Sequence, residues 1–285
     1  MEYVILDIEW NGTYSHKLKR YFNEIIELGA VKFDDNKNII DEFSTVICPQ
    51  VGKKISSRVQ CLTNITDNEL STGLKFDVAL EKFKEFLGDL TLMTWGTSDI
   101  LVLMENNEYY YGERRLNFIK KFIDLQRYCE HKLEYINGPQ LGLVTATQLL
   151  DIDTNQRGQH RALNDSILSF ECLKRLFDKD ELEDFVQDSD CDEFYDRIGF
   201  KTAIIRDLNN PLIDRSDMEF ECDVCGTKAK KISTWSFRNK SYRAKFECPN
   251  CGHSFIGRIQ FKLKYEGLIA KKSLISMDEE NNDEK

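Results

Sequence analysis

The 285-residue chain lacks any apolar run that approaches the roughly 20 residues a bilayer-spanning helix needs. It also lacks a secretory signal pattern, because Met1 and Glu2 lead directly into a strand without a basic segment followed by an apolar one. Its nine cysteines are an odd number and, apart from four near the C-terminus, are scattered without the spacing of a secreted disulfide framework. We therefore expect a cytoplasmic protein in a reducing compartment, without a membrane partner.

Positive charge is also scarce, since 39 Lys and Arg stand against 49 Asp and Glu and the net charge is -10. This balance argues against a protein that coats nucleic acid with its whole surface. The charge is unevenly distributed, however: residues 222–272 hold 12 Lys and Arg against three Asp and Glu. An acidic body joined to a basic module indicates that the module contacts a polyanion.

Two carboxylates stand at the end of the first strand pattern, residues 3–10. Asp7 and Glu9 alternate with Ile8, so both project from one face of the strand. An isolated pair of this kind is usually just solvated. Side by side, the two charges repel each other, and a divalent cation is the partner that keeps both ionised.

Two further acids stand at the ends of predicted elements. Asp99 follows the buried strand pattern 90–95, and Asp165 lies in the first turns of an amphipathic helix. His160 precedes Asp165 by five residues, which within one helix would separate them by about 140°, so we expect His160 on the Gly158-containing loop before the helix. Four acids and a base suit a two-metal phosphoryl-transfer site.

Taken together, Asp7-x-Glu9, Asp99 and His160-x4-Asp165 resemble, in order and distance, the three motifs of the DEDDh 3'-to-5' exonucleases. That superfamily includes RNase T and enzymes that trim RNA ends. The resemblance covers roughly residues 1–178. It implies an α/β fold, with an RNase H-like mixed sheet flanked by helices.

The same resemblance implies the roles of the site residues. Asp7, Glu9, Asp99 and Asp165 would hold two Mg²⁺ or Mn²⁺ ions, and His160 would be the general base for the attacking water. Histidine suits this task because imidazole exchanges a proton near neutral pH.

Substrate contacts also follow from the resemblance. Ile8, Trp10, Leu62 and Thr63 would face the terminal nucleotide, with Trp10 as a stacking surface.

One motif departs from the family pattern. The middle motif, Trp95-Gly96-Thr97-Ser98-Asp99, lacks the aromatic residue that the family often has just before the aspartate. Glu105 is the only other acid nearby in the sequence. Glu24 and Glu27 are further candidates for the metal cluster, although acids that flank a hairpin strand are more often solvated.

Four cysteines near the C-terminus form two Cys-x2-Cys pairs with 22 residues between them: Cys222, Cys225, Cys248 and Cys251. Two close thiolate pairs are what tetrahedral Zn²⁺ needs, so we expect one structural zinc ion. Disulfides are the alternative in an oxidising compartment, and an iron–sulfur centre remains another because thiolates alone do not separate the metals.

Basic residues alternate with aromatic ones between the two cysteine pairs. We expect residues 234–241 to form a hairpin, as in the zinc ribbons that this segment resembles. Trp235, Phe237, Tyr242 and Phe246 are either base-stacking surfaces or the module's own core, and we assign at least two of them to the core. His253 is expected beside the metal rather than on it, since four cysteines complete the shell.

Local patterns also predict several elements. These are a turn over residues 11–13, a hairpin of strands 25–33 and 39–48, a helix over 116–122 and a strand over 123–128.

The predicted domains are an exonuclease domain (1–180), a helical extension with linker (181–217), a zinc ribbon (218–272) and an acidic disordered tail (273–285). The predicted function is 3'-to-5' hydrolysis of single-stranded nucleic-acid ends, with RNA as the expected substrate and the ribbon binding nucleic acid or a protein partner. Two alternatives remain. One is a catalytically weak adaptor that binds a partner protein; the other is a DNA proofreading or repair exonuclease.

Overall fold

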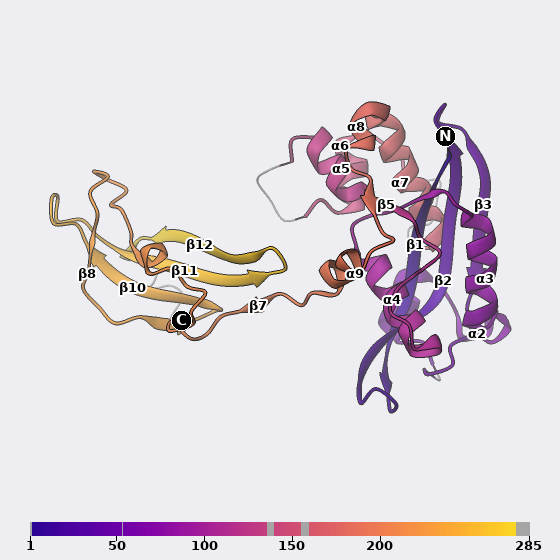
Figure 1. Ribbon diagram of the computed structural model, residues 1–285, viewed down its shortest axis with the longest axis horizontal. Helices are drawn as coiled ribbons and strands as arrows, with labels where there is room; N and C mark the ends of the chain where they lie inside the picture. The colour runs from indigo at the N-terminus through magenta and orange to yellow at the C-terminus, as the bar shows by residue number, and fades with distance from the viewer. Residues whose placement is uncertain (1, 53, 136–139, 155–159, 278–285) are drawn as a thin grey trace. The chain divides into compact units, whose positions relative to one another are not determined.

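The computed structural model describes residues 2–52, 54–135, 140–154 and 160–277. The chain divides into two compact units, Met1–Gly199 and Phe200–Lys285, and Figure 1 shows helices around a sheet in the first and mainly strands in the second. Gly158, on the loop predicted to carry His160, and the end of the predicted acidic tail lie outside the described residues.

A sheet in the order β3-β2-β1-β4-β5-β6 forms the centre of the first unit (Figure 1). Antiparallel β1–β2 and parallel β1–β4 pairing make this sheet mixed, as predicted. The strands are β1 (Glu2–Ser15), β2 (Arg20–Asp34), β3 (Ile39–Val46), β4 (Thr91–Thr94), β5 (Lys121–Asp124) and β6 (Gln187–Asp188). The helices are α1 (Ser57–Thr63), α2 (Asp67–Thr72), α3 (Phe76–Leu87), α4 (Ser98–Tyr111), α5 (Leu125–Lys132), α6 (Leu143–Leu149), α7 (Ala162–Leu176), α8 (Lys179–Glu183) and α9 (Asp192–Gly199).

Strand β1 is buried on both faces, because its alternate side chains enter two different cores. Val4, Leu6 and Ile8 pack in a cluster that includes residues of α3 and α4. Tyr3 and Ile5 pack in a second cluster that includes residues of α5 and α7. Burial on both faces explains why this strand begins as an uninterrupted apolar run. It also fixes the strand that carries Asp7 and Glu9 between two helical layers.

Strands β1 and β2 are longer than the strands predicted over residues 3–10 and 25–33, and they pair as one hairpin. The predicted turn at residues 11–13 is wrong, since the ladder continues to the pair Ser15 and Arg20 after one irregularity at Glu9/Trp10. The facing strand supplies backbone partners for these residues, and the ladder outweighs their local turn preference. The predicted pairing of residues 25–33 with 39–48 is confirmed by the β2–β3 ladder.

The helix and strand predicted over residues 116–128 are wrong, because a strand and then a helix form there instead. Residues 116–120 form no helix, β5 begins at Lys121, and α5 occupies most of the predicted strand. Asp124 explains the change, because its side chain accepts a hydrogen bond from the Arg127 amide and starts the helix. The apolar pattern by itself does not distinguish a short buried strand from a short buried helix.

The second unit is built on a sheet in the order β12-β11-β10-β8, with β7 pairing β11 and β9 pairing β10. The predicted hairpin at residues 234–241 is confirmed. Its turn is formed by Asn239 and Lys240, whose φ angles of 47° and 60° suit a two-residue hairpin loop. The elements are β7 (Ala203–Ile204), η1 (Arg215–Met218), β8 (Lys230–Lys231), β9 (Ser236–Arg238), β10 (Ser241–Glu247), β11 (Ser254–Lys264) and β12 (Gly267–Ile275).

The region predicted as extension and linker, residues 181–217, is divided between the two units. Phe194 and Tyr195 of α9 enter the core of the first unit, so this helix packs against the sheet domain. Across the described ranges, no helix has the length and apolar character that crossing a membrane requires.

Candidate active site and metal centres

Three of the predicted acids come together at one point of the sheet. Asp7 and Glu9 project from β1 and Asp165 from the first turn of α7, and each offers a carboxylate oxygen within 4.8 Å of the others. The residues come from distant parts of the chain, so the sheet and helix together create the cluster.

Gly29 explains how α7 reaches the carboxylates. It pairs with Asp7 across the β1–β2 ladder, and a Cβ atom on it would lie 2.0 Å from the Leu163 backbone nitrogen. The Ser166 hydroxyl donates a hydrogen bond of 2.7 Å to the Gly29 carbonyl. The start of α7 therefore lies directly on β2, and this contact brings Asp165 beside Asp7.

Asp99 lies at the start of α4, next to this cluster but outside the group of three. Its Oδ1 accepts a hydrogen bond of 3.1 Å from the Ile8 amide, and its side chain is 5% exposed. Glu105, the alternative acid, forms an ion pair of 3.4 Å with Arg20 instead. Among the neighbouring charges, that of Asp99 raises the pKa of Asp7 most strongly.

Burial shifts the acid–base behaviour of all four acids. Burial first, and then the charge of Asp99, raises the pKa of Asp7 well above its usual range. Burial and the Asp165 charge raise the pKa of Glu9 to about 8, and burial raises the pKa of Asp99 to about 7. Burial also raises the pKa of Asp165. A bound cation would oppose these shifts, because its positive charge favours the ionised carboxylates.

The donor set fits a hard divalent cation. Carboxylate oxygens are the ligands that Mg²⁺ and Mn²⁺ prefer, and the 4.8 Å grouping lets one ion reach Asp7, Glu9 and Asp165 after small side-chain movements.

His160 lies outside α7, as expected from its spacing to Asp165. It is half-buried and has a left-handed backbone conformation with φ of 63°. A backbone hydrogen bond from His160 and the electrostatic effect of this neighbour oppose the burial that raises the pKa of Asp165. The histidine thus lies directly beside a carboxylate of the cluster.

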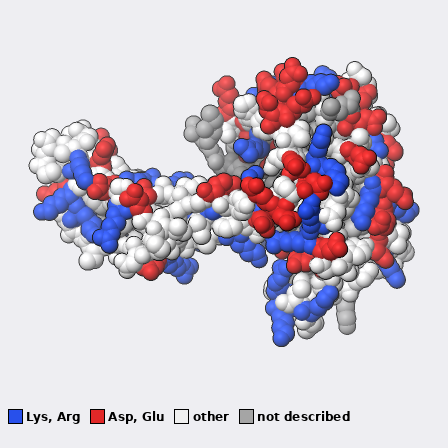
Figure 2. Space-filling model, in the orientation of Figure 1, with Lys and Arg blue, Asp and Glu red and all other residues white. Residues whose placement is uncertain are grey.

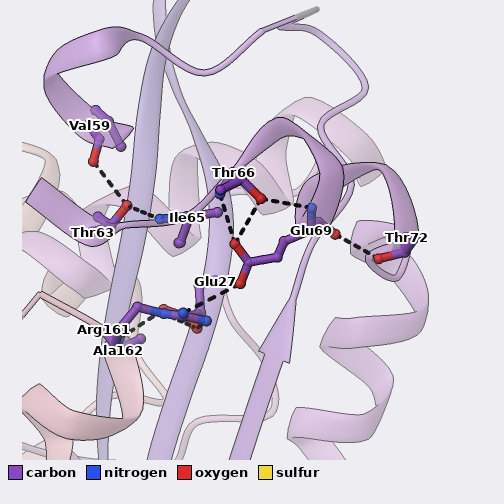
Figure 3. Close-up of polar contacts among 9 residues, drawn as sticks. All are labelled: Glu27, Val59, Thr63, Ile65, Thr66, Glu69, Thr72, Arg161 and Ala162. Carbon is purple, nitrogen blue, oxygen red and sulfur yellow. Dashed lines mark hydrogen bonds and ion pairs between the residues drawn. The ribbon is translucent and has the colours of Figure 1, made fainter. Parts of the chain in front are cut away.

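A buried ion pair next to His160 was not foreseen from the sequence. Glu27 on β2 is 1% exposed and accepts hydrogen bonds from Arg161 Nε at 3.0 Å, from Arg161 Nη2 at 2.6 Å and from the Ala162 amide at 3.0 Å. Figure 3 shows the same arginine reaching Glu69, 3.5 Å away, whose carboxylate also caps α2 through Thr66. This network ties the start of α7 to β2 and to α2.

The expectation that acids flanking the hairpin strand are solvated is wrong. Glu27 is buried as described, and Glu24 is also 1% exposed. The Glu24 carboxylate accepts the backbone amides of Gln50, Val51 and Gly52 at 2.6–2.8 Å. Both acids thus fix loops and helix ends by hydrogen bonds. The signal available in the sequence was their place within the hydrophobic pattern of β2, which buries its neighbours on both sides.

The four expected substrate contacts lie in different environments. The Ile8 side chain is 2% exposed and belongs to the core, so only its backbone borders the site. Thr63 is 1% exposed, and its hydroxyl donates to the Val59 carbonyl and accepts from the Ile65 amide, as Figure 3 shows. Trp10 is half-buried against the core, and Leu62 is 45% exposed at the end of α1. Leu62 thus has the most accessible side chain of the four.

The four cysteines of the second unit form a separate cluster. Their sulfur atoms lie within 4.8 Å of one another, with 3.6 Å between Cys222 and Cys251 and 3.4 Å between Cys225 and Cys248. Tetrahedral zinc with Zn–S bonds of about 2.3 Å places sulfurs about 3.8 Å apart, so the set fits zinc. Each pair sits on a tight turn closed by a glycine with φ of 71°, Gly226 and Gly252.

The aromatic residues of the ribbon divide as expected. Tyr242 and Phe246 are buried in its core, whereas Trp235 and Phe237 pack against that core and are only half-buried. His253 Nε2 lies 3.1 Å from an Asp223 carboxylate oxygen and is outside the cysteine cluster, as predicted.

The class of protein is shown by the sequence family. Residues 4–173 match the Exonuclease family model (RNase T), which is more than half of the chain, so the chain belongs to this family. The predicted resemblance to this superfamily is confirmed.

Individual relatives are similar over the same region. A Bacillus subtilis protein named "Probable 3'-5' exonuclease KapD" is 28% identical over 186 residues, which are 63% of this chain and 87% of that protein. The "DNA polymerase III PolC-type" of Clostridium perfringens is 32% identical over 178 residues, 62% of this chain. The chain spans only 11% of the length of that polymerase.

Solved structures show the same fold. A 3'-exonuclease studied for its recognition of the 3' end of a histone mRNA stem-loop has a TM-score of 0.55 and 19% identity, over 66% of this chain and 84% of that one. The nuclease domain of 3'hExo, a DEDDh family member bound to rAMP, has a TM-score of 0.53 and 21% identity, over 61% of this chain and 90% of that one.

Proposed function

We propose that the chain is a metal-dependent 3'-to-5' exonuclease that removes nucleoside 5'-monophosphates from single-stranded RNA ends. The observation that carries the proposal is the gathering of Asp7, Glu9 and Asp165 within 4.8 Å, with Asp99 and His160 beside them. Family membership supports the same reaction class. The choice of RNA rests on the resemblance of the motifs to the RNA-trimming enzymes.

The proposed chemistry is hydrolysis of the last phosphodiester bond. Asp7, Glu9, Asp99 and Asp165 would hold the cations, which would supply charge stabilisation to the attacking and leaving oxygens. His160 accepts a proton from the attacking water, whose oxygen forms the new bond to phosphorus. The bond from phosphorus to the 3' oxygen of the preceding nucleotide breaks, and that oxygen takes up a proton from solvent water.

A DNA substrate is the second candidate. The observation in its favour is the 32% identity to a PolC-type DNA polymerase over the exonuclease region. A 2'-hydroxyl preference separates the two candidates, because this group is what distinguishes RNA from DNA at a given site.

The second unit is proposed to bind nucleic acid through its basic residues, with one structural zinc ion in the cysteine cluster. A cytoplasmic location is part of the same proposal. We propose no protein partner, because the described residues carry no observation that favours one.

The test is a time course on 5'-labelled RNA and DNA oligonucleotides of identical sequence, with Mg²⁺ or Mn²⁺. Stepwise shortening from the 3' end is expected, and both Asp7→Ala and His160→Ala should abolish it. Lys37→Ala, in the turn between β2 and β3, is the matched control and should keep full activity. Binding of the oligonucleotide without any shortening would overturn the enzyme and favour the adaptor.

A further inference from the structure

Two segments of the first unit contain no acidic residue. Residues 10–23 hold Lys17, Lys19 and Arg20, and residues 43–66 hold three further basic residues, whereas the whole chain has 49 Asp and Glu. Such segments are unexpected in a body whose charge is strongly negative. The first follows Glu9 directly, and the second contains the exposed Leu62.

The fold joins the two acid-free segments. Asn11 donates a side-chain hydrogen bond of 3.2 Å to the Lys54 carbonyl and accepts one of 3.0 Å from the Ser56 amide. Glu24, the acid that ends the first segment, is 1% exposed, and its carboxylate accepts the amides of residues 50–52. Its negative charge is therefore covered at the place where the segments meet.

The outer part of the hairpin, residues 10–23, is a braced arm. Phe22 stacks on Tyr109 of α4 with ring centroids 4.8 Å apart. Lys17 donates a hydrogen bond of 2.8 Å to the Tyr109 carbonyl and lies 4.4 Å from the centre of its ring. Arg20 pairs with Glu105, which is 18% exposed. The arm is thus held in place before any ligand binds, so little order has to be gained on binding.

The end of the arm exposes basic and aromatic groups together. Tyr21 is 76% exposed and Tyr14 is 45% exposed, and their rings contact each other edge to face. Lys19 lies in the turn with φ of 53° and is exposed. Figure 1 shows this hairpin running past the rest of the sheet, and Figure 2 shows blue side chains at its end.

We propose that the arm and the segment around Lys54 form a track for the single strand that leads away from the catalytic carboxylates. Ser15 lies six positions beyond Glu9 on the strand, so the arm extends about 20 Å from the site, a distance that several nucleotides span. Basic side chains attract phosphates, and exposed aromatic rings stack bases without sequence preference. The track also offsets the repulsion between an acidic body and a polyanion. This inference rests on the proposed exonuclease function.

The test combines substrate length with charge removal in the full chain. The probes are 5'-fluorescein oligouridylates of 4 and 20 nucleotides, and the variants are the double Lys19→Gln/Lys54→Gln and the single Tyr21→Ser. For the longer probe we expect kcat/KM to fall by about tenfold in each variant, and the loss to grow with length. The slope of log K for oligonucleotide binding, plotted against the logarithm of the salt concentration, should become less steep by about 0.7 for each phosphate that the variant no longer neutralises.

Lys37→Gln is the matched control, since Lys37 is also a hairpin-turn lysine with positive φ, 66°, at the opposite end of β2. Equal losses for both probe lengths, or an equal loss in the control, overturn the track while leaving the exonuclease intact. If the native chain shortens neither probe, the proposed function fails. Fluorescence anisotropy of the 20-nucleotide probe then tests the track separately. Weaker binding by the double variant than by the control supports the track, and equal binding overturns it.

Discussion

The two metal-binding clusters of this protein are built in opposite ways. The cysteine cluster takes its ligands from two short local turns, each closed by a glycine. The carboxylate cluster takes its ligands from β1 and α7, which lie near opposite ends of the first unit in sequence and meet on a finished sheet. The first unit surrounds its cluster with two large cores, whereas the second has one small core.

This difference indicates which cluster supports folding. A small core leaves much of the folding free energy of the ribbon to its metal. In the first unit the fold holds the carboxylates together despite their mutual repulsion, so the fold stabilises the site rather than the reverse. Four experiments would break or sharpen this contrast.

The largest expected effect is loss of zinc from the ribbon. Cys248→Ser should remove about 10 kcal/mol of metal-linked folding free energy and unfold the second unit, because three thiolates no longer complete a tetrahedron. Zinc content and limited proteolysis measure the outcome, with cleavage expected inside residues 200–277 and protection of residues 2–199. Cys61→Ser, at an exposed thiol on α1, is the control. A variant that keeps its ribbon protected without zinc would contradict the contrast.

For the carboxylate cluster we expect the first unit to stay folded without metal, with a stability that depends on pH. The pKa values of Asp7, Glu9, Asp99 and Asp165 are raised in the fold, so the metal-free folded state keeps protons that the unfolded chain releases above about pH 4. The contribution of these carboxyl groups to the free energy of unfolding is therefore fully present below that pH. It falls as pH rises toward about 8, by at most about 1.4 kcal/mol per pH unit for each proton. Mg²⁺ should restore it most strongly at the alkaline end.

Thermal unfolding of zinc-loaded protein dialysed free of Mg²⁺ measures this dependence. Fluorescence of Trp10 and Trp95 reports on the first unit in a Trp235→Phe background. Asp7→Asn should flatten the pH profile and weaken the Mg²⁺ response. A stability that rises between pH 5 and 8 without Mg²⁺ would show that the cluster is not under charge repulsion.

A substitution at Gly29 should separate α7 from the sheet. Gly29→Ala places a Cβ atom 2.0 Å from the Leu163 nitrogen, and relieving this clash should cost about 3 kcal/mol. Displacement of Asp165 by about 1 Å would lower kcat by about 100-fold. Gly142→Ala at the start of α6 is the control, since its nearest atom is Thr145 Oγ1 at 4.0 Å. Denaturant unfolding and single-turnover rates report the two effects, and a Gly29→Ala protein as active as the control would refute the close approach.

The smallest of the four effects concerns the ion pair beside His160. Arg161→Met leaves the Glu27 carboxylate buried without its partner and should cost about 2 kcal/mol, while Glu69→Gln at the exposed end of the same arginine should cost about 0.5 kcal/mol. The double variant Arg161→Met/Glu27→Gln should recover part of the loss, which a double-mutant cycle of unfolding free energies measures. Additive losses would show that the pair is not coupled.

Much of this protein was predictable because short-range patterns carry strong physical preferences. Alternation of Asp7 and Glu9 with Ile8 determines that both carboxylates share a face, and Cys-x2-Cys spacing determines that each thiolate pair is local. The hairpin at residues 234–241 and the position of His160 before its helix follow from similar reasoning and agree with the structure. The mixed sheet was expected only from the resemblance to a known family, and the structure has it.

Other features depended on contacts between distant residues. The sequence does not reveal that the start of α7 packs directly on Gly29. It also does not show that Glu27 and Glu24 are buried, or that the β1–β2 ladder continues to Ser15. Each is decided by what another element places opposite the residue, and local propensity is too weak to resist those contacts. The sequence by itself therefore determined the kinds of chemical groups and their local faces. Only the tertiary structure decided which groups meet, because burial and charge repulsion act on atoms brought together from distant parts of the chain.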